Sequence, residues 1–193
     1  SKFKDYSIKN DFGKLNLEVI NFEKLFIRRL SLQDRKDSLN TIDNKTIDKY
    51  LYILQNSFHI ELVKPFYSNQ RKELTKMPKV YFKDSGMRNI ALNRFYDFKN
   101  REDQGQLFEN YVFKRLTNLY DKDTIKYWRT TDNKEIDFVV TTSFNEGLAF
   151  EVKMKCPNSK MISEKKFTET YPGYKFDMIS YSPDDECKWI LKL

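Results

Sequence analysis

Two short runs near the middle of the chain read as strands: EIDFVV at residues 135–140 and AFEVK at residues 149–153. In each, apolar and polar residues alternate with the two-residue period of a pleated strand. The apolar face of the first run is expected to comprise Ile136, Phe138 and Val140. A polar turn around residues 145–147 would let the two strands pair as a hairpin. This pairing predicts that Asp137, Glu151 and Lys153 share one polar face.

Two carboxylates and an ammonium at this spacing are suited to metal-assisted hydrolysis of a phosphodiester. Mg²⁺ takes oxygen ligands, and one or two carboxylates with waters and phosphate oxygens satisfy it. A cation held by Asp137 and Glu151 would lower the pKa of a bound water and neutralise charge on the phosphate. Lys153 would orient that water or stabilise the transition state. The alternative is a solvated strand face with an ion pair between Asp137 and Lys153.

A third carboxylate lies on a predicted helix that includes residues 105–116, GQLFENYVFKRL. Its apolar stripe is expected to comprise Phe108, Val112, Leu116 and Leu119. Glu109 projects inside this stripe, where a carboxylate must be paired, protonated or bound to a cation. The alternative is that Glu109 lies at the edge of the stripe and reaches Arg115 or a backbone donor.

A helix glutamate, a strand aspartate and Glu-x-Lys on the next strand resemble the PD-(D/E)xK restriction-endonuclease-like superfamily, in the arrangement of archaeal-type Holliday-junction resolvases. Carried over residue by residue, Glu109, Asp137, Glu151 and Lys153 match the acidic and lysine positions of that superfamily. The resemblance implies that Mg²⁺ or Mn²⁺ is the cofactor and that the three acids are its ligands.

Four segments in order also resemble the C-terminal domain of unknown function of prokaryotic AAA-type ATPases. They are MPKVYFKDSG at 77–86, GQLFENYV at 105–112, YWR at 127–129 and EIDF at 135–138. This resemblance covers about residues 43–181. It implies a winged-helix segment followed by a nuclease-like fold, normally attached behind a nucleotide-binding domain that is absent from this chain.

Composition and charge favour an anionic partner. The chain has 193 residues, and 35 Lys and Arg against 28 Asp and Glu give a net charge of +7, which suits DNA. Two cysteines and one histidine do not make a zinc site. No run is long enough to cross a bilayer, no small-molecule site is evident, and reduced thiols are typical of a cytoplasmic protein. The five glycines form no phosphate-binding loop, so this chain is not the ATPase motor itself.

The N-terminal half has the element order of a winged helix. A helix is expected within residues 16–30, another from residue 43 or 44 to about 57, and strands at 58–63 and 80–82. The capped helix would be the recognition helix, and residues 69–79 would be the wing. The residues expected to contact nucleic acid are Lys45, Lys49, Arg71, Lys72, Lys76 and Lys79. The alternative is a protein-contact or linker module.

The sequence therefore predicts an α/β (α+β) protein with a winged-helix-like segment at 1–95 and a nuclease-like domain at 105–193. The second domain is expected to have the order αβββαβ and a central mixed sheet flanked by helices. A charged stretch at residues 96–104 is expected to be a surface loop and the domain boundary. Two functions fit: a metal-dependent deoxyribonuclease in the C-terminal part of an AAA-type ATPase, or a catalytically silent nuclease-fold platform that binds DNA or protein.

Overall fold

The computed structural model describes residues 44–66, 78–155, 161–181 and 188–189, without the side chains of residues 44–47 and 188–189. The helix expected within residues 16–30 and the tip of the expected wing, residues 69–77, lie outside this description. The described elements are α2 (Asn44–Asn56), β1 (Ile60–Val63), β2 (Lys79–Phe82), α4 (Ser85–Ala91), η1 (Phe98–Asn100), α5 (Gln104–Leu119), η2 (Lys122–Thr124), β3 (Ile125–Arg129), β4 (Glu135–Ser143), β5 (Glu146–Lys153), α6 (Ile162–Thr170), β6 (Tyr174–Ser180) and β7 (Lys188–Trp189).

Five of the described strands form a central sheet in the order β3-β4-β5-β6-β7. β3, β4 and β5 pair antiparallel, whereas β6 runs parallel to β5 and β7 parallel to β6. α6 lies between β5 and β6 in the chain, because parallel neighbours need a crossover rather than a tight turn. The fold is therefore mixed α/β. From α5 to β6 the elements follow the predicted order of helix, three strands, helix and strand.

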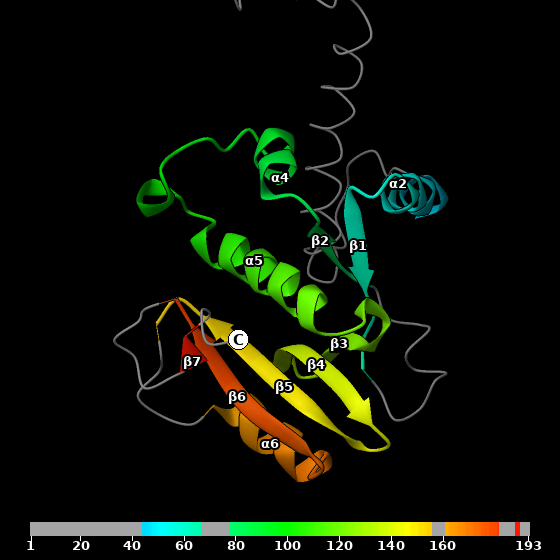
Figure 1. The fold of residues 1–193 in the computed structure, drawn as a ribbon, viewed down its shortest axis with the longest axis vertical. Coiled ribbons are helices and arrows are strands. Elements are labelled where there is room, and N and C mark those ends of the chain that lie inside the picture. The colour runs from blue at the N-terminus through cyan, green and yellow to red at the C-terminus, as the bar shows by residue number, and fades with distance from the viewer. Residues whose placement is uncertain (1–43, 67–77, 156–160, 182–187, 190–193) are drawn as a thin grey trace, which may run out of the picture.

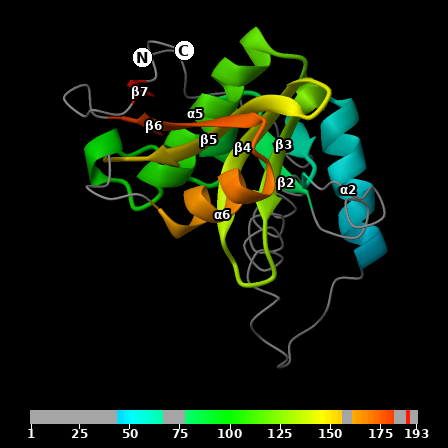
Figure 2. The same ribbon diagram turned by 90° about the horizontal axis from the view of Figure 1, so that it is seen from below.

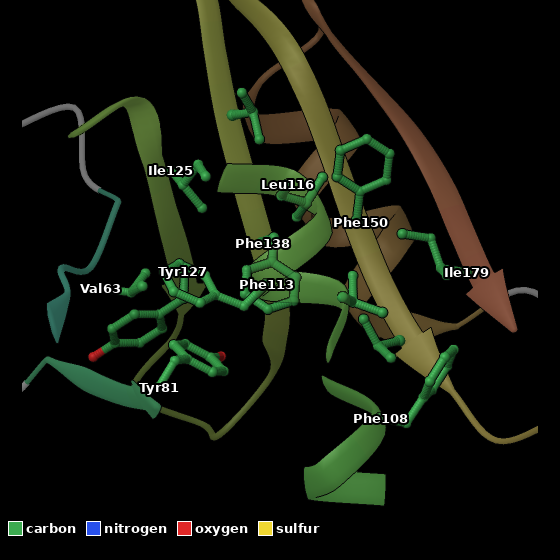
Figure 3. Packing of buried hydrophobic residues seen from close by; sticks show 13 residues of the cluster. Val63, Tyr81, Phe108, Phe113, Leu116, Ile125, Tyr127, Phe138, Phe150 and Ile179 are labelled. Carbon is green, nitrogen blue, oxygen red and sulfur yellow. The ribbon is translucent and has the colours of Figure 1, made fainter. Parts of the chain in front are cut away.

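The sheet lies between two helices, with α5 on one face and α6 on the other (Figures 1 and 2). On the α5 side, Phe108, Val112, Phe113 and Leu116 pack against Phe138, Val140, Phe150 and Val152 (Figure 3). On the α6 side, Phe167 packs with Trp128, Ile136, Val139, Ala149 and Tyr174. Both faces are covered, so the central strands are buried on both sides. Among the described helices, none is long and apolar enough to cross a membrane.

The expected alternation along β4 is wrong at one point. Ile136 packs on the α6 side, whereas Phe138 packs on the α5 side, so these two residues do not share a face. The break falls at Asp137, whose carboxylate oxygen Oδ2 accepts a hydrogen bond from the backbone N–H of Val152 at 3.0 Å. The pairing of β4 with β3 shifts register at the same place, where two residues of β4 lie opposite one residue of β3, and this β-bulge reverses the faces.

The β4–β5 hairpin forms at the predicted polar turn. Asn145 adopts the left-handed conformation with φ of 59°. At Gly147 a β-carbon would lie 2.1 Å from the backbone oxygen of Val140, so only glycine fits this close approach. The hairpin sets Phe138 opposite Phe150 and thereby brings the ends of the two acidic runs together.

The N-terminal segment packs onto the same core. β1 and β2 pair antiparallel, with Ile60 opposite Phe82. Tyr81 of β2 stacks on Phe113 of α5 with ring centroids 4.6 Å apart, and it belongs to the same buried cluster as Phe138. The order of helix, strand and strand is as predicted, while the winged-helix assignment itself stays a prediction. The described parts on both sides of residue 96 share one hydrophobic core.

The expected surface loop at residues 96–104 is in part buried. Arg101 and Asp103 are buried, together with Arg88 of α4. Asp103 accepts hydrogen bonds from Arg88 at 2.6 Å and from Arg101 at 2.8 and 2.9 Å, and Arg94 lies 3.5 Å away. We call these four residues the arginine cluster. The cluster connects α4 to the start of α5. Arg101 and Asp103 can be buried in a charged stretch without periodicity because they form ion pairs with each other and with Arg88.

Candidate functional site

Side chains from four elements gather at one end of the β4–β5 hairpin, under α5. α5 supplies Glu109, β4 supplies Asp137, and β5 supplies Glu151 and Lys153. A fifth residue, Lys79 of β2, links the first two, because its ammonium lies 2.9 Å from Glu109 Oε1 and 3.0 Å from Asp137 Oδ1. The structure thus brings together the four residues that the sequence singles out for catalysis.

Lys79 has a different position from the one expected for it. The sequence predicts it on the wing as a phosphate contact, whereas its side chain is only 17% exposed and its ammonium contacts a third carboxylate, Glu135 Oε1, at 2.5 Å. It also lies 5.6 Å from the centre of the Tyr127 ring. An ammonium held by three carboxylates is not available to DNA phosphates, so we no longer assign Lys79 to a nucleic-acid interface. We call the six residues Lys79, Glu109, Glu135, Asp137, Glu151 and Lys153 the acid–lysine cluster.

The sequence reasoning missed one member of the site, Glu135, and one neighbour, Tyr81, and it gave Lys79 a different role. Glu135 bridges Lys79 and Arg129. The Tyr81 hydroxyl donates a hydrogen bond to Glu109 Oε1 at 2.5 Å. The two-residue spacing of Lys79 and Tyr81 puts them on one face of β2, but it does not show that this face meets Glu109 of α5.

The contacts of the acids differ from both alternatives given above, an Asp137–Lys153 ion pair and a Glu109 that reaches Arg115 or a backbone donor. Lys153 pairs with Glu151 at 2.7 Å, and Asp137 pairs with Lys79. Glu109 is held by Lys79 and Tyr81. Each acid therefore takes its partner from within the site.

Burial and mutual repulsion shift the acids towards protonation. Burial, followed by the charge of Asp137, raises the pKa of Glu151 to about 7. The pKa of Glu109 is also raised, first by burial and then by Asp137, against the opposing effect of Lys79. Burial would lower the pKa of Lys79, but the negative charges of the surrounding carboxylates of Glu109, Asp137 and Glu135 outweigh it, and the pKa lies well above its usual value. Burial is therefore the main reason that both acids are harder to ionise, and the nearby charge of Asp137 adds to it.

The donors suit a divalent cation bound by two carboxylates. Glu151 is 4% exposed, and its Oε2 atom is buried without a hydrogen-bond partner. A buried carboxylate oxygen of this kind is a ready ligand for a hard cation, and Mg²⁺ is commonly held by one or two carboxylates with waters and phosphate oxygens. Within the described ranges, no group of three or more Asp, Glu, His or Cys side chains is arranged to hold a metal ion. The residues therefore fit a site built on Asp137 and Glu151, while Glu109 is held by Lys79 and Tyr81.

Most of the residues expected to contact nucleic acid cannot be placed. Lys49 is exposed on α2. The side chain of Lys45 and residues Arg71, Lys72 and Lys76 lie outside the described residues. Their role in DNA contact stays a prediction.

Two family models match separate ranges of the chain. Residues 22–97 match the model of a domain of unknown function, DUF8612. Residues 104–187 match the model of a second domain of unknown function, DUF4143. The second domain is known from proteins associated with AAA-type ATPases.

Two curated mycobacterial proteins are similar to the chain. They are the uncharacterized protein Rv2008c of Mycobacterium tuberculosis and the uncharacterized protein Mb2031c of Mycobacterium bovis, each 26% identical over 110 residues. The match covers 56% of this chain but only 25% of each relative. No solved structure matches the chain.

The acid–lysine cluster spans both matched ranges. Lys79 falls in the first range, and the other five members of the cluster fall in the second. The site is therefore built jointly by segments that match separate family models.

Proposed function

We propose that the protein is a DNA-binding, metal-dependent phosphodiesterase and the C-terminal part of an AAA-type ATPase. The observation that carries this proposal is the convergence of Asp137, Glu151 and Lys153 with a buried carboxylate oxygen that has no partner. The resemblance to PD-(D/E)xK nucleases supports it, as does the net charge of +7. A cytoplasmic location and an N-terminal ATPase partner belong to the same proposal.

Each residue of the site has a distinct task under this proposal. Asp137 and Glu151 would hold Mg²⁺ or Mn²⁺, which when bound supplies a more acidic water and charge neutralisation at the phosphate. Lys153 has a side chain that is 39% exposed beside Glu151, so its ammonium can reach a phosphate oxygen in solvent. Tyr81 and Lys79 fix the third acid, Glu109, in place.

A second function is favoured by one observation. Three ion pairs with Lys79 partly neutralise the acids without any metal, so the same cluster can serve as a structural centre. Under this proposal the chain is a catalytically silent platform for DNA or protein beside an ATPase.

A nicking assay on supercoiled plasmid with Mg²⁺ or Mn²⁺ separates the two functions. We expect the parent protein to nick the plasmid, and Asp137→Asn and Lys153→Met each to lower the rate by about 100-fold or more, as loss of an electrostatic catalytic group does. Asp132→Asn is the matched control, because Asp132 is an exposed acid that pairs with Lys166 away from the site.

Three outcomes decide between the proposals. Loss of cleavage in the two site variants but not in the control supports the phosphodiesterase. Equal cleavage in all variants would remove the assignment of these residues. No cleavage by the parent on any DNA form, together with salt-dependent DNA binding, would establish the platform instead.

A further inference from the structure

Lys79 occupies the centre of the acid–lysine cluster, whereas the other cations lie at its rim. The Lys79 side chain is 17% exposed and contacts carboxylates from α5 and β4. The side chains of Lys153 and Arg129 are each 39% exposed and pair with one acid each, Glu151 and Glu135. The central ammonium thus joins acids of two different elements, α5 and β4.

The charges show what Lys79 does for the fold. Four carboxylates meet here, those of Glu109, Glu135, Asp137 and Glu151. Without the Lys79 ammonium, Glu109 and Asp137 would lose the cation that both of them contact, in a place where burial weakens the screening of their repulsion. An internal positive charge therefore holds α5 and β4 together at this point.

The same ammonium affects any divalent cation that Asp137 binds. One oxygen of Asp137 contacts Lys79, and the other accepts the N–H of Val152. A cation on Asp137 would thus share an oxygen with the ammonium or displace it. Two positive centres a few ångströms apart repel each other strongly in a partly buried site.

We infer that Lys79 is a resident counter-ion of the site: it holds Glu109, Glu135 and Asp137 together when no divalent cation is bound, and it competes with such a cation for Asp137. This inference rests on the proposed function only in placing a divalent cation at Asp137. Lys79 is then a positioning residue that sets the concentration of divalent cation at which the site is half occupied. Cleavage of DNA is not required for it to hold.

The test compares Lys79→Met with Lys83→Met in the full 193-residue chain. Lys83 directly follows the same strand and pairs with Glu61 at 3.2 Å, outside the site. Lys83→Met is therefore a matched control that also removes one lysine and its ion pair. Thermal unfolding is followed by circular dichroism in EDTA and across a Mn²⁺ series. We expect Lys79→Met to unfold at a lower temperature than the control in EDTA, and Mn²⁺ to restore it. The Mn²⁺ concentration that gives half of the rise in unfolding temperature should be about tenfold or more lower for Lys79→Met than for the parent protein.

A second variant covers the case in which Lys79→Met does not fold in EDTA. Lys79→Met with Glu135→Gln removes one positive and one negative charge, so the charge balance of the site is kept. If neither variant responds to Mn²⁺ at lower concentration than Lys83→Met, the inference is wrong and Lys79 is only a structural ion pair. Because the readout is unfolding, a parent protein that fails to nick DNA would count against the phosphodiesterase and not against this inference.

Discussion

The arginine cluster and the acid–lysine cluster have opposite charge balance. In the arginine cluster, one acid, Asp103, lies among three arginines. Hydrogen bonds from Arg101, with further bonds and charge from Arg88, hold the pKa of Asp103 well below its usual range. In the acid–lysine cluster, carboxylates outnumber the lysines, and the pKa of Glu151 rises to about 7.

The direction of the pKa shift separates a structural cluster from a candidate reactive one. An acid surrounded by cations is fully ionised and stabilises the fold, whereas crowded acids with too few cations destabilise it unless something else binds. Proteins commonly tolerate such a local loss of stability where function needs it. The comparison therefore predicts that neutralising one acid has opposite effects in the two places.

The largest effect is expected for Asp103→Asn. The substitution leaves the guanidinium groups of Arg88 and Arg101 buried without their counter-ion, and such a loss destabilises a fold by about 3–5 kcal/mol. Urea unfolding at pH 7 measures the change in the free energy of unfolding. Asp132→Asn, which alters an exposed ion pair, should change it little. A small effect of Asp103→Asn would mean that the arginine cluster does not hold α4 to α5.

The next effect, in the opposite direction, is expected for Glu151→Gln. Because folding raises the pKa of Glu151 from about 4.5 to about 7, the folded protein binds this proton more tightly than the unfolded chain. The resulting stability is present below pH 4.5 and is lost as the pH rises to 7 and beyond, by up to about 3 kcal/mol. Glutamine mimics the protonated acid, so the variant should be more stable than the parent at pH 8 and similar to it at pH 5.

Urea unfolding of both proteins at several pH values tests this sign. Glu146→Gln, an exposed acid at the start of the same strand, is the control for a general effect of lost charge. A Glu151→Gln protein that is less stable than the parent at pH 8 would show that the ion pair with Lys153 outweighs the crowding of the acids.

The smallest effect is expected for Tyr81→Phe. This change removes the hydrogen bond to Glu109 but keeps the ring that stacks on Phe113, so the loss should be about 1–2 kcal/mol. Phe113→Leu, which alters the stack and keeps the hydroxyl, is a complementary variant. In the nicking assay, Tyr81→Phe should lower the rate less than Asp137→Asn. An effect as large as that of Asp137→Asn would place Tyr81 in direct contact with the reacting groups.

The sequence predicted those parts of the fold that follow from local periodicity. The hairpin around residues 145–147, the helix with Glu109 and the order from α5 to β6 were all expected. Alternation alone could not locate the break at Asp137, because it arises from a register shift in the pairing of β4 with β3. Asp137 and Glu151 were found because they lie with Lys153 on the polar face expected for the hairpin, and Glu109 because it lies inside an apolar stripe.

Lys79 and Tyr81 could not be found in this way. They lie on a short strand about 30 residues before Glu109, and a lysine in a basic stretch is typical of a solvated loop. Their role depends on tertiary packing of β2 against α5, which no local pattern specifies. The same reason hides the arginine cluster, since Arg88, Arg101 and Asp103 show no period and are buried only because they pair.

The position of Lys79 in β2 matters for the design of truncated fragments and chimaeras of this chain. A fragment that starts at residue 104, where the second family match begins, would carry the acids of the cluster and leave their central positive charge behind. The strand with its lysine should therefore be transplanted together with the helix and hairpin that it serves. Exchanging either matched range alone would separate Lys79 from the acids that it contacts.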